Sequence, residues 1–199
     1  MDQLKFLKLR NSLFVLAFLM LLAGCMESEY SRLVKRELNS EVRYDSLFLT
    51  FSFGDQRRNF FSKGWIQNSE GLIKQGPNNQ NVEYLMGEAK KGSSQIRMLF
   101  YPRFTEEDHM YIMDLSFEYL GWFPTTDKFN SENLLPVIKD TLMNWYGGNS
   151  FIKVSLGDET EEDLWVKVDG NRQITLRIID EQTVEGKMED LSIKYKDKL

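Results

Sequence analysis

Cysteine, histidine and proline are scarce in this sequence, which has one Cys, one His and 4 Pro among 199 residues. A single cysteine cannot form an internal disulfide, and a single histidine cannot build the histidine-rich sites of zinc enzymes. Positive charge is also in deficit, because 25 Lys and Arg stand against 30 Asp and Glu, a net charge of -5. Proteins that bind nucleic acids carry the opposite balance. We therefore expect neither a disulfide scaffold nor a nucleic-acid partner.

The motifs that hold cofactors and nucleophiles are missing as well. The sequence has no Gly-x-Gly-x-x-Gly fingerprint, no phosphate-binding loop and no Gly-x-Ser-x-Gly elbow. The one histidine, His109, follows the acidic residues 106–108, a context typical of a solvated turn and not of a catalytic triad. The sequence thus predicts no cofactor and no catalytic residue, and the leading interpretation is a protein that is not an enzyme.

Aromatic residues, in contrast, are plentiful. They make up 13% of the chain, and hydrophobic residues together make up 42%. This composition is sufficient for a packed core and differs from that of a disordered chain. The length fits one domain or two small ones.

The N-terminal residues have the order of a secretory signal. Lys5, Lys8 and Arg10 form a positive segment, and the apolar run 13–23 follows it. This run of 11 residues is shorter than the roughly 20 residues that a membrane-spanning helix requires. It is therefore predicted to be the apolar region of a signal peptide and not a stable membrane span.

The junction Leu22-Ala23-Gly24-Cys25 comes next. It resembles the lipobox of bacterial lipoproteins, in which the signal peptidase cuts before the cysteine and the thiol then carries diacylglycerol. The resemblance implies a signal peptide over residues 1–24 and a mature chain anchored to a membrane through Cys25. Because no aspartate follows the cysteine, the implied location is the bacterial outer membrane, on either its periplasmic or its outward face.

Hydropathy periodicity predicts the elements of the first half. Apolar residues at helical spacing predict a short helix within 30–40, and strict alternation predicts a strand over 47–53. Asp55 is placed to cap a following helix that ends near Gly71. The face of that helix that is expected to be buried consists of Phe61, Trp65 and Leu72.

Strands dominate the expected second half. Three are predicted first, over 82–86, 95–101 and 110–119. A second long helix should begin at Ser131 and end before Gly147. Four further strands follow, over 151–156, 164–168, 173–179 and 188–195, with a hairpin turn at Asp169-Gly170.

Consecutive strands that are joined by short loops pair in antiparallel fashion. The expected fold class is therefore α+β: an antiparallel β-sheet with two main helices packed on one face, plus an N-terminal helix after the lipid anchor. The expected boundaries are residues 1–24 for the signal peptide, 25–44 for the lipidated cysteine with a short tether helix, and 45–199 for a single domain. A helix followed by antiparallel strands occurs twice in this domain, and a duplication is one interpretation of that order.

Aromatic residues cluster directly after the predicted strand 110–119. Tyr119, Trp122 and Phe123 stand beside a glycine and a proline, where the chain must turn. Loop aromatics are common anchors for sugars or protein partners, because their rings bury area at low entropy cost. These three are the candidate partner-binding residues, and the alternative is that they close the core at the end of the strand.

Acidic residues are densest in 158–163, where five of six positions are Asp or Glu. Asp158 and Glu162 make this segment a weak candidate for calcium, which prefers oxygen ligands. The segment lacks the ligand spacing of a calcium-binding loop, so a solvated acidic hairpin is the alternative. No other metal site is predicted.

Beyond the lipobox, the sequence resembles bacterial envelope lipoproteins of similar size. In layout alone, with Gly54-Asp55 and a helix before an antiparallel sheet, it resembles the BamE-like lipoproteins of outer-membrane assembly, and no functional residue is transferred. The leading hypothesis is a lipid-anchored extracytoplasmic protein that binds or scaffolds an envelope protein partner. Two alternatives stay open: an envelope hydrolase that cleaves glycan or peptide through carboxylates, and a protein that binds a small apolar ligand between helices and sheet.

Overall fold

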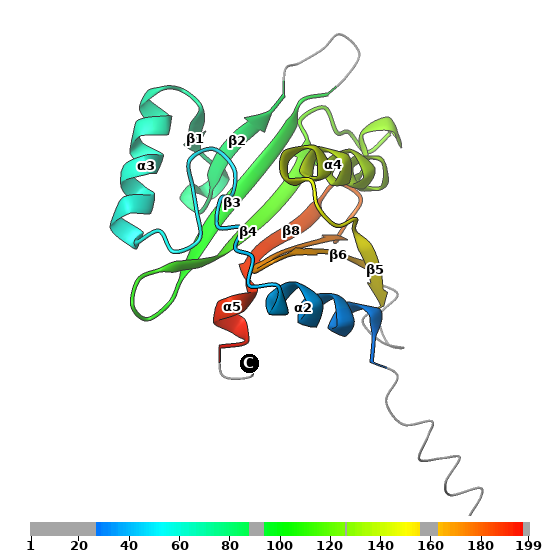
Figure 1. Ribbon diagram of the computed structural model, residues 1–199. Coiled ribbons are helices and arrows are strands. Elements are labelled where there is room, and N and C mark those ends of the chain that lie inside the picture. The colour runs from blue at the N-terminus through cyan, green and yellow to red at the C-terminus, as the bar shows by residue number, and fades with distance from the viewer. Residues whose placement is uncertain (1–26, 88–93, 126, 156–162, 197–199) are drawn as a thin grey trace, which may run out of the picture. The chain divides into compact units, whose positions relative to one another are not determined.

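The computed structural model describes residues 27–87, 94–125, 127–155 and 163–196 (Figure 1). The folded unit begins at Leu33. Its centre is an antiparallel sheet of eight strands in the order β1-β2-β3-β4-β8-β7-β6-β5. The strands are β1 (Ile73–Gln75), β2 (Val82–Met86), β3 (Ile96–Phe104), β4 (Met110–Tyr119), β5 (Ile152–Ser155), β6 (Asp163–Asp169), β7 (Arg172–Ile178) and β8 (Val184–Asp190). The predicted α+β class with an antiparallel sheet is confirmed.

Helices precede and interrupt the strands. The described helices are α2 (Glu29–Asn39), α3 (Arg57–Ser69), α4 (Ser131–Tyr146) and α5 (Leu191–Lys194), with short 3-10 helices η1 (Pro77–Asn79) and η2 (Asp127–Phe129). Helix α4 packs against β4, β7 and β8, whereas α3 lies beside β1, which is an edge strand of the sheet (Figure 1). The two long helices of this unit therefore contact different strands.

One face of the sheet carries the hydrophobic core. Residues that lie directly opposite one another on paired strands share a face, and Phe100, Leu115, Gly186 and Leu176 form one such row across β3, β4, β8 and β7. Helix α4 contributes three residues to the same core, each at most 1% exposed: Leu134, Ile138 and Leu142. The spacing of these three side chains puts them on one face of the helix.

The opposite face of β1 to β4 carries ion pairs between strands. Lys74 pairs with the buried Glu83 across β1 and β2 at 2.9 Å. Arg103 pairs with Asp114 across β3 and β4 at 2.5 Å. Cross-strand pairs of this kind contribute about 0.2–1 kcal/mol each, so their main effect is to favour the observed register.

The predicted strand over 47–53 is wrong. The segment forms a tight loop, in which the N–H of Leu47 donates to the carbonyl of Phe51 (3.0 Å) and Leu49 has a positive φ of 55°. Leu47 and Phe48 are both 5% exposed, although neighbouring residues of a strand point to opposite faces. The alternation of apolar residues therefore reflects a loop that is folded into the core.

The predicted orientation of the next helix is also wrong. Helix α3 buries Phe60, whose ring stacks on that of Phe51 with centroids 4.4 Å apart. This contact turns the expected apolar face toward solvent: Phe61 is 53% exposed, Trp65 73% and Leu72 48%. The helix does end where the sequence predicts, with Gly71 at a positive φ of 75°.

Asp55 does not cap α3, contrary to the prediction. Its carboxylate accepts hydrogen bonds from the backbone N–H of Ser52 (3.0 Å) and from Nζ of Lys63 (2.7 Å). Gln56 occupies the N-cap position without a side-chain hydrogen bond. The carboxylate that was expected to cap the helix is therefore held by the loop before the helix and by a lysine nearly two turns into it.

Most other boundaries agree with the predictions. The ranges expected for β2 and β4 are confirmed, and β3 continues past the predicted end at residue 101. The strand expected over 188–195 overlaps β8 only at 188–190, because β8 begins at Val184 and ends at Asp190, whose carboxylate caps α5 by accepting from the N–H of Ser192 (2.9 Å). Strand β1 was not predicted.

The hairpin between β6 and β7 is confirmed at Asp169-Gly170, and it is both polar and buried. Lys167 is 0% exposed, and its Nζ lies 2.5 Å from Oδ2 of Asp169 and 2.6 Å from the carbonyl of Asn149. The N–H of Gly170 donates to Oε2 of Glu37 in α2 (3.0 Å). Polar groups thus tie the C-terminal part of α2 to the turn of this hairpin.

Replacement of Glu37 by glutamine is expected to lower the free energy of unfolding at neutral pH by about 1–3 kcal/mol. Burial alone would raise the pKa of Glu37, but hydrogen bonds from Gly170, Asn149 and Arg36 outweigh it and hold the pKa below its ordinary value of 4.5. Because the pKa is depressed in the folded state, the contribution of the carboxylate is complete above 4.5 and is lost as the pH falls below it. Urea unfolding at neutral and acidic pH measures this. An identical loss of stability on acidification in Glu37→Gln and in the natural chain would contradict it.

Candidate functional site

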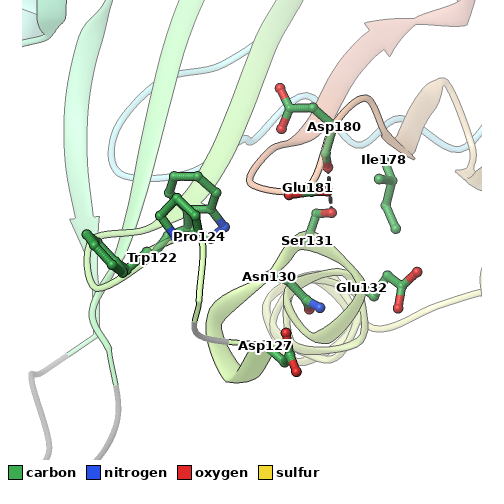
Figure 2. A pocket seen from close by; sticks show the side chains of 10 residues that line it. Trp122, Pro124, Asp127, Asn130, Ser131, Glu132, Ile178, Asp180 and Glu181 are labelled. Atoms are coloured by element: carbon green, nitrogen blue, oxygen red, sulfur yellow. Dashed lines mark hydrogen bonds between the residues drawn. The ribbon is translucent and has the colours of Figure 1, made fainter.

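A cleft of about 450 Å³ lies where the end of β4 faces the beginning of α4 (Figure 2). On one side stand the aromatic residues that follow β4, and on the other stand the first turn of α4 and the loop between β7 and β8. Ten residues line it: Trp122, Phe123, Pro124, Asp127, Asn130, Ser131, Glu132, Ile178, Asp180 and Glu181. Three segments that are distant in sequence therefore build one concave surface.

The aromatic wall is positioned by the turn that ends β4. The N–H of Leu120 donates to the carbonyl of Gln95 (2.9 Å), and the N–H of Gly121 donates to Oγ of Ser94 (2.7 Å). A side chain at position 121 would clash with that hydroxyl, because an added Cβ would lie 2.9 Å from it. The turn leaves Trp122 half-buried and Phe123 62% exposed.

The opposite wall is fixed by Ser131, the first residue of α4. Its Oγ donates to the carbonyl of Asp180 (2.6 Å), and its N–H donates to the carbonyl of Glu181 (2.9 Å). Ser131 is 1% exposed, so both bonds are shielded from water. Asn130 caps the helix by accepting from the N–H of Asn133 (2.9 Å). The start of α4 is thereby joined to the loop between β7 and β8.

The cleft is acidic. Four of the lining residues are carboxylic acids, namely Asp127, Glu132, Asp180 and Glu181, and none of the ten is a lysine or an arginine. Asp180 is held by the backbone, because its Oδ1 accepts from the N–H groups of Gln182 (2.8 Å) and Thr183 (2.7 Å). Carboxylates beside aromatic rings form a surface that favours a positively charged group with an apolar flank.

The structure brings two of the three predicted aromatic residues to this cleft. Trp122 and Phe123 line it, whereas Tyr119 does not. The ring of Tyr119 lies 5.3 Å from that of Phe129, and burial raises the pKa of its hydroxyl. Tyr119 thus packs against η2 and does not line the cleft.

The remaining predicted site residues are found elsewhere. Cys25, Asp158 and Glu162 lie outside the described residues. His109 lies in the turn between β3 and β4, where its Nδ1 is 3.0 Å from the carbonyl of Gly54, and it is not part of the cleft. Across the ranges that the structure describes, no group of three or more His, Cys, Asp or Glu side chains is arranged to hold a metal ion. Within the same ranges, no helix is long and apolar enough to cross a membrane.

The acidic residues of the cleft were not predicted from the sequence as part of a site. Ser131 and Glu132 were recognised only as the start of a helix, and the loop of Asp180 and Glu181 carried no motif. The contact between Ser131 and Asp180 joins residues 49 positions apart. A local pattern holds no information about such a contact, so the aromatic loop was the only part of the cleft with a signal.

A second recess, of about 310 Å³, lies between the 47–53 loop, β2 and the end of α4. All six of its lining residues are apolar or aromatic: Leu47, Phe48, Leu49, Tyr84, Trp145 and Tyr146. Burial raises the pKa of the Tyr146 hydroxyl, so this group stays neutral. The recess offers no charged group for catalysis, and of the open alternatives only the binding of an apolar ligand applies to it.

No protein-family model matches this chain, and no curated protein or solved structure matches it either.

Proposed function

We propose that this chain is a lipid-anchored protein of the bacterial outer membrane that binds another envelope component through the cleft beside α4. The lipobox-like residues ending in Cys25 support the anchor. The observation that carries the binding role is the cleft itself, in which Trp122 and Phe123 face four carboxylic acids. Its walls are held by hydrogen bonds from the N–H of Gly121 and from the buried Ser131, so the surface is formed before a ligand arrives.

The proposed ligand is a cationic segment of an envelope protein, such as a lysine or arginine side chain with its aliphatic stem. The ammonium or guanidinium group would lie near Glu132 and Glu181, where it is attracted by the carboxylates. The stem would pack on Trp122 and Phe123, as long cationic side chains commonly do on aromatic rings. The affinity of such a contact falls as salt concentration rises, because the carboxylates are open to solvent.

Cross-linking in cells followed by affinity capture tests the anchored binding role. The natural chain and a Cys25→Ser form are captured in parallel, and the proteins that co-purify are identified. A stoichiometric envelope protein that is captured only with the natural chain supports the proposal. Equal recovery of a partner by both forms would count against the anchor, and recovery of no protein partner would count against the binding role.

Replacement of Trp122 by alanine is expected to weaken partner capture by at least about tenfold, because a central aromatic residue commonly dominates an interface. Phe123→Ala is a companion variant, since Phe123 is 62% exposed and contributes little to the core. Trp145→Ala is the matched control, because Trp145 is 41% exposed and lies in the other recess. The measurement is capture at equal protein level together with the melting temperature. Unchanged capture by both cleft variants would rule out this surface.

A hydrolase is the second candidate, and the grouping of carboxylates in one cleft is what favours it. Glu132 and Glu181 come from different elements and line the same space, as acid and base pairs of glycosidases do. The purified chain is incubated with envelope glycan and peptide fragments, and release of products is followed. Cleavage that is lost in both Glu132→Gln and Glu181→Gln would favour the enzyme, whereas no cleavage would favour the binding role.

We also infer that α3 and α4 belong to one helical layer over the core face and that α2 follows the lipid anchor directly. Phe60 of α3 belongs to the same core cluster as Ile138 of α4, which supports a shared face. The sheet order supports an origin by duplication, since α3 with β1 to β4 and α4 with β5 to β8 each place a helix before four antiparallel strands.

A further inference from the structure

The apolar recess at the end of α4 is backed by a buried arginine. Arg172 is 3% exposed, and its guanidinium carbon lies 4.1 Å from the centre of the Tyr146 ring, which lines the recess. Its Nη1 donates to the carbonyl of Ser46 (3.0 Å), directly before the 47–53 loop. Arg172 therefore contacts the approach to this loop and the end of α4, two of the segments that enclose the recess.

This arginine shares its counter-charge with a second buried cation. Oδ2 of Asp169 lies 2.5 Å from Nζ of Lys167, which is 0% exposed, and 3.8 Å from Nη2 of Arg172. Asp190, on the strand beside Arg172, is paired instead with Arg43 at 3.1 Å. Burial lowers the pKa of Arg172, because the protein interior solvates its charge poorly. A further anion close to Arg172 would therefore be stabilised.

Two polar atoms at the same place are unpaired. Among the residues that the structure describes, neither the hydroxyl of Tyr146 nor Nε of Arg172 has a hydrogen-bond partner, although both atoms are buried. Buried donors are nearly always paired in proteins, and an unpaired one indicates strain or a functional role. Both groups can donate, and the arginine is a cation. A carboxylate, which only accepts and carries negative charge, is the complementary group.

The recess provides space for an apolar chain next to these donors. Its volume of about 310 Å³ is close to the lower end of the range of about 300–1,000 Å³ that is typical of small-molecule sites, and its lining is entirely apolar or aromatic. Trp145 is 41% exposed in this lining. Leu49 has a positive φ of 55°, which is strained for a bulky side chain. The wall that Leu49 forms is therefore the part of the recess most easily displaced.

We propose that the recess binds a medium-chain aliphatic carboxylic acid. The chain packs on Trp145 and Leu49, and the carboxylate accepts from the hydroxyl of Tyr146 and from Nε of Arg172. Because that hydroxyl is buried, the carboxylate reaches it when the 47–53 loop moves outward at Leu49. The small volume favours a short chain over a long acyl chain or a protein segment. This inference is independent of the cleft, which is lined by other residues.

Titration of the full chain with decanoate measures this binding. Calorimetry gives the dissociation constant, and decanol is the comparison ligand that keeps the chain and lacks the charge. Tyr146→Phe removes the hydroxyl alone, and we expect it to weaken decanoate binding about tenfold. Without ligand, the same variant should melt no lower than the natural chain, because it loses a buried donor that has no partner.

Two further variants locate the ligand. Trp145→Ala removes one wall of the recess and is expected to weaken the binding of decanoate and of decanol alike, because the chains of both ligands pack on the indole ring. Trp122→Ala is the matched control, since Trp122 lines the cleft and not the recess. It should bind decanoate as tightly as the natural chain does.

Four outcomes would overturn the proposal. Absence of decanoate binding below its micelle concentration would show that the recess takes no such ligand. Equal affinity of Tyr146→Phe and the natural chain for decanoate would exclude the hydroxyl, and equal affinity for decanol and decanoate would exclude the buried charge. An equal loss in Trp122→Ala and Trp145→Ala would assign no specific site to the ligand. Partner capture through Trp122 is measured separately, so its failure leaves this result unaffected.

Discussion

Replacement of Phe60 by alanine should lower the free energy of unfolding by about 3–5 kcal/mol, the range typical of a large aromatic residue removed from a core. Phe60 is 1% exposed, stacks on Phe51 and meets Phe104 edge-on with ring centroids 6.0 Å apart. Deletion of its ring therefore leaves a cavity and also releases α3 from the sheet. Urea unfolding followed by circular dichroism measures the change.

The neighbouring residue provides the matched control. Phe61→Ala should cost less than about 1 kcal/mol, because Phe61 is 53% exposed and loses little burial. The pair tests the orientation of α3 directly, since hydropathy alone assigns Phe61 to the core. A larger loss for Phe61→Ala than for Phe60→Ala would mean that the helix is rotated about its axis, with Phe61 toward the core.

The second large effect is expected at the buried ion pair of the β6-β7 hairpin. Asp169→Asn should lower the free energy of unfolding by about 3–5 kcal/mol, because it leaves Lys167 buried without its counter-charge. Lys167 is 0% exposed, and its Nζ lies 2.5 Å from Oδ2 of Asp169. Asparagine keeps a side-chain oxygen for the N–H of Asn149, which Asp169 Oδ1 accepts at 2.7 Å. The substitution therefore keeps this bond and places an NH2 group, which cannot accept a hydrogen bond, opposite the ammonium of Lys167.

The double variant Lys167→Met with Asp169→Asn separates the charge from the shape of the side chain. Methionine fills most of the lysine volume and removes the buried cation, so the double variant should be more stable than Asp169→Asn alone. Chemical unfolding of the natural chain, both single variants and the double variant completes the cycle. Additive losses would show that Lys167 and Asp169 do not stabilise one another.

The strands were predictable where one face is buried and the other is wet. Tyr111 to Tyr119 alternate in β4 because their neighbours on β3 and β8 alternate in the same way, and the predicted limits of β4 agree with the structure. The same alternation in 47–53 has another cause, since that loop is packed into the core through adjacent side chains. Periodicity reports burial, and it does not by itself distinguish a strand from a loop that is packed into the core.

The site was predictable only in part, for a related reason. Trp122 was recognised in the sequence because it is an aromatic residue between a glycine and a proline, directly after the predicted strand 110–119. Glu181 and Asp180 have no such context, and they reach the cleft because Ser131 bonds to their carbonyls. The exposure of α3 was hidden by its own hydrophobicity, because Trp65 was expected to be in the core and is instead 73% exposed.

The order of strands in the sheet also determines how the chain can fold. Within each half, every strand pairs with a neighbour in sequence, so these hairpins form through short loops at little entropic cost. The halves meet along one seam, from the pair Ile112 and Glu189 to the pair Phe117 and Val184. Contacts between residues so distant in sequence form slowly. We therefore expect pairing of β4 with β8 to set the folding rate. The two four-stranded halves form earlier, and until the halves join, β4 and β8 are unpaired edge strands.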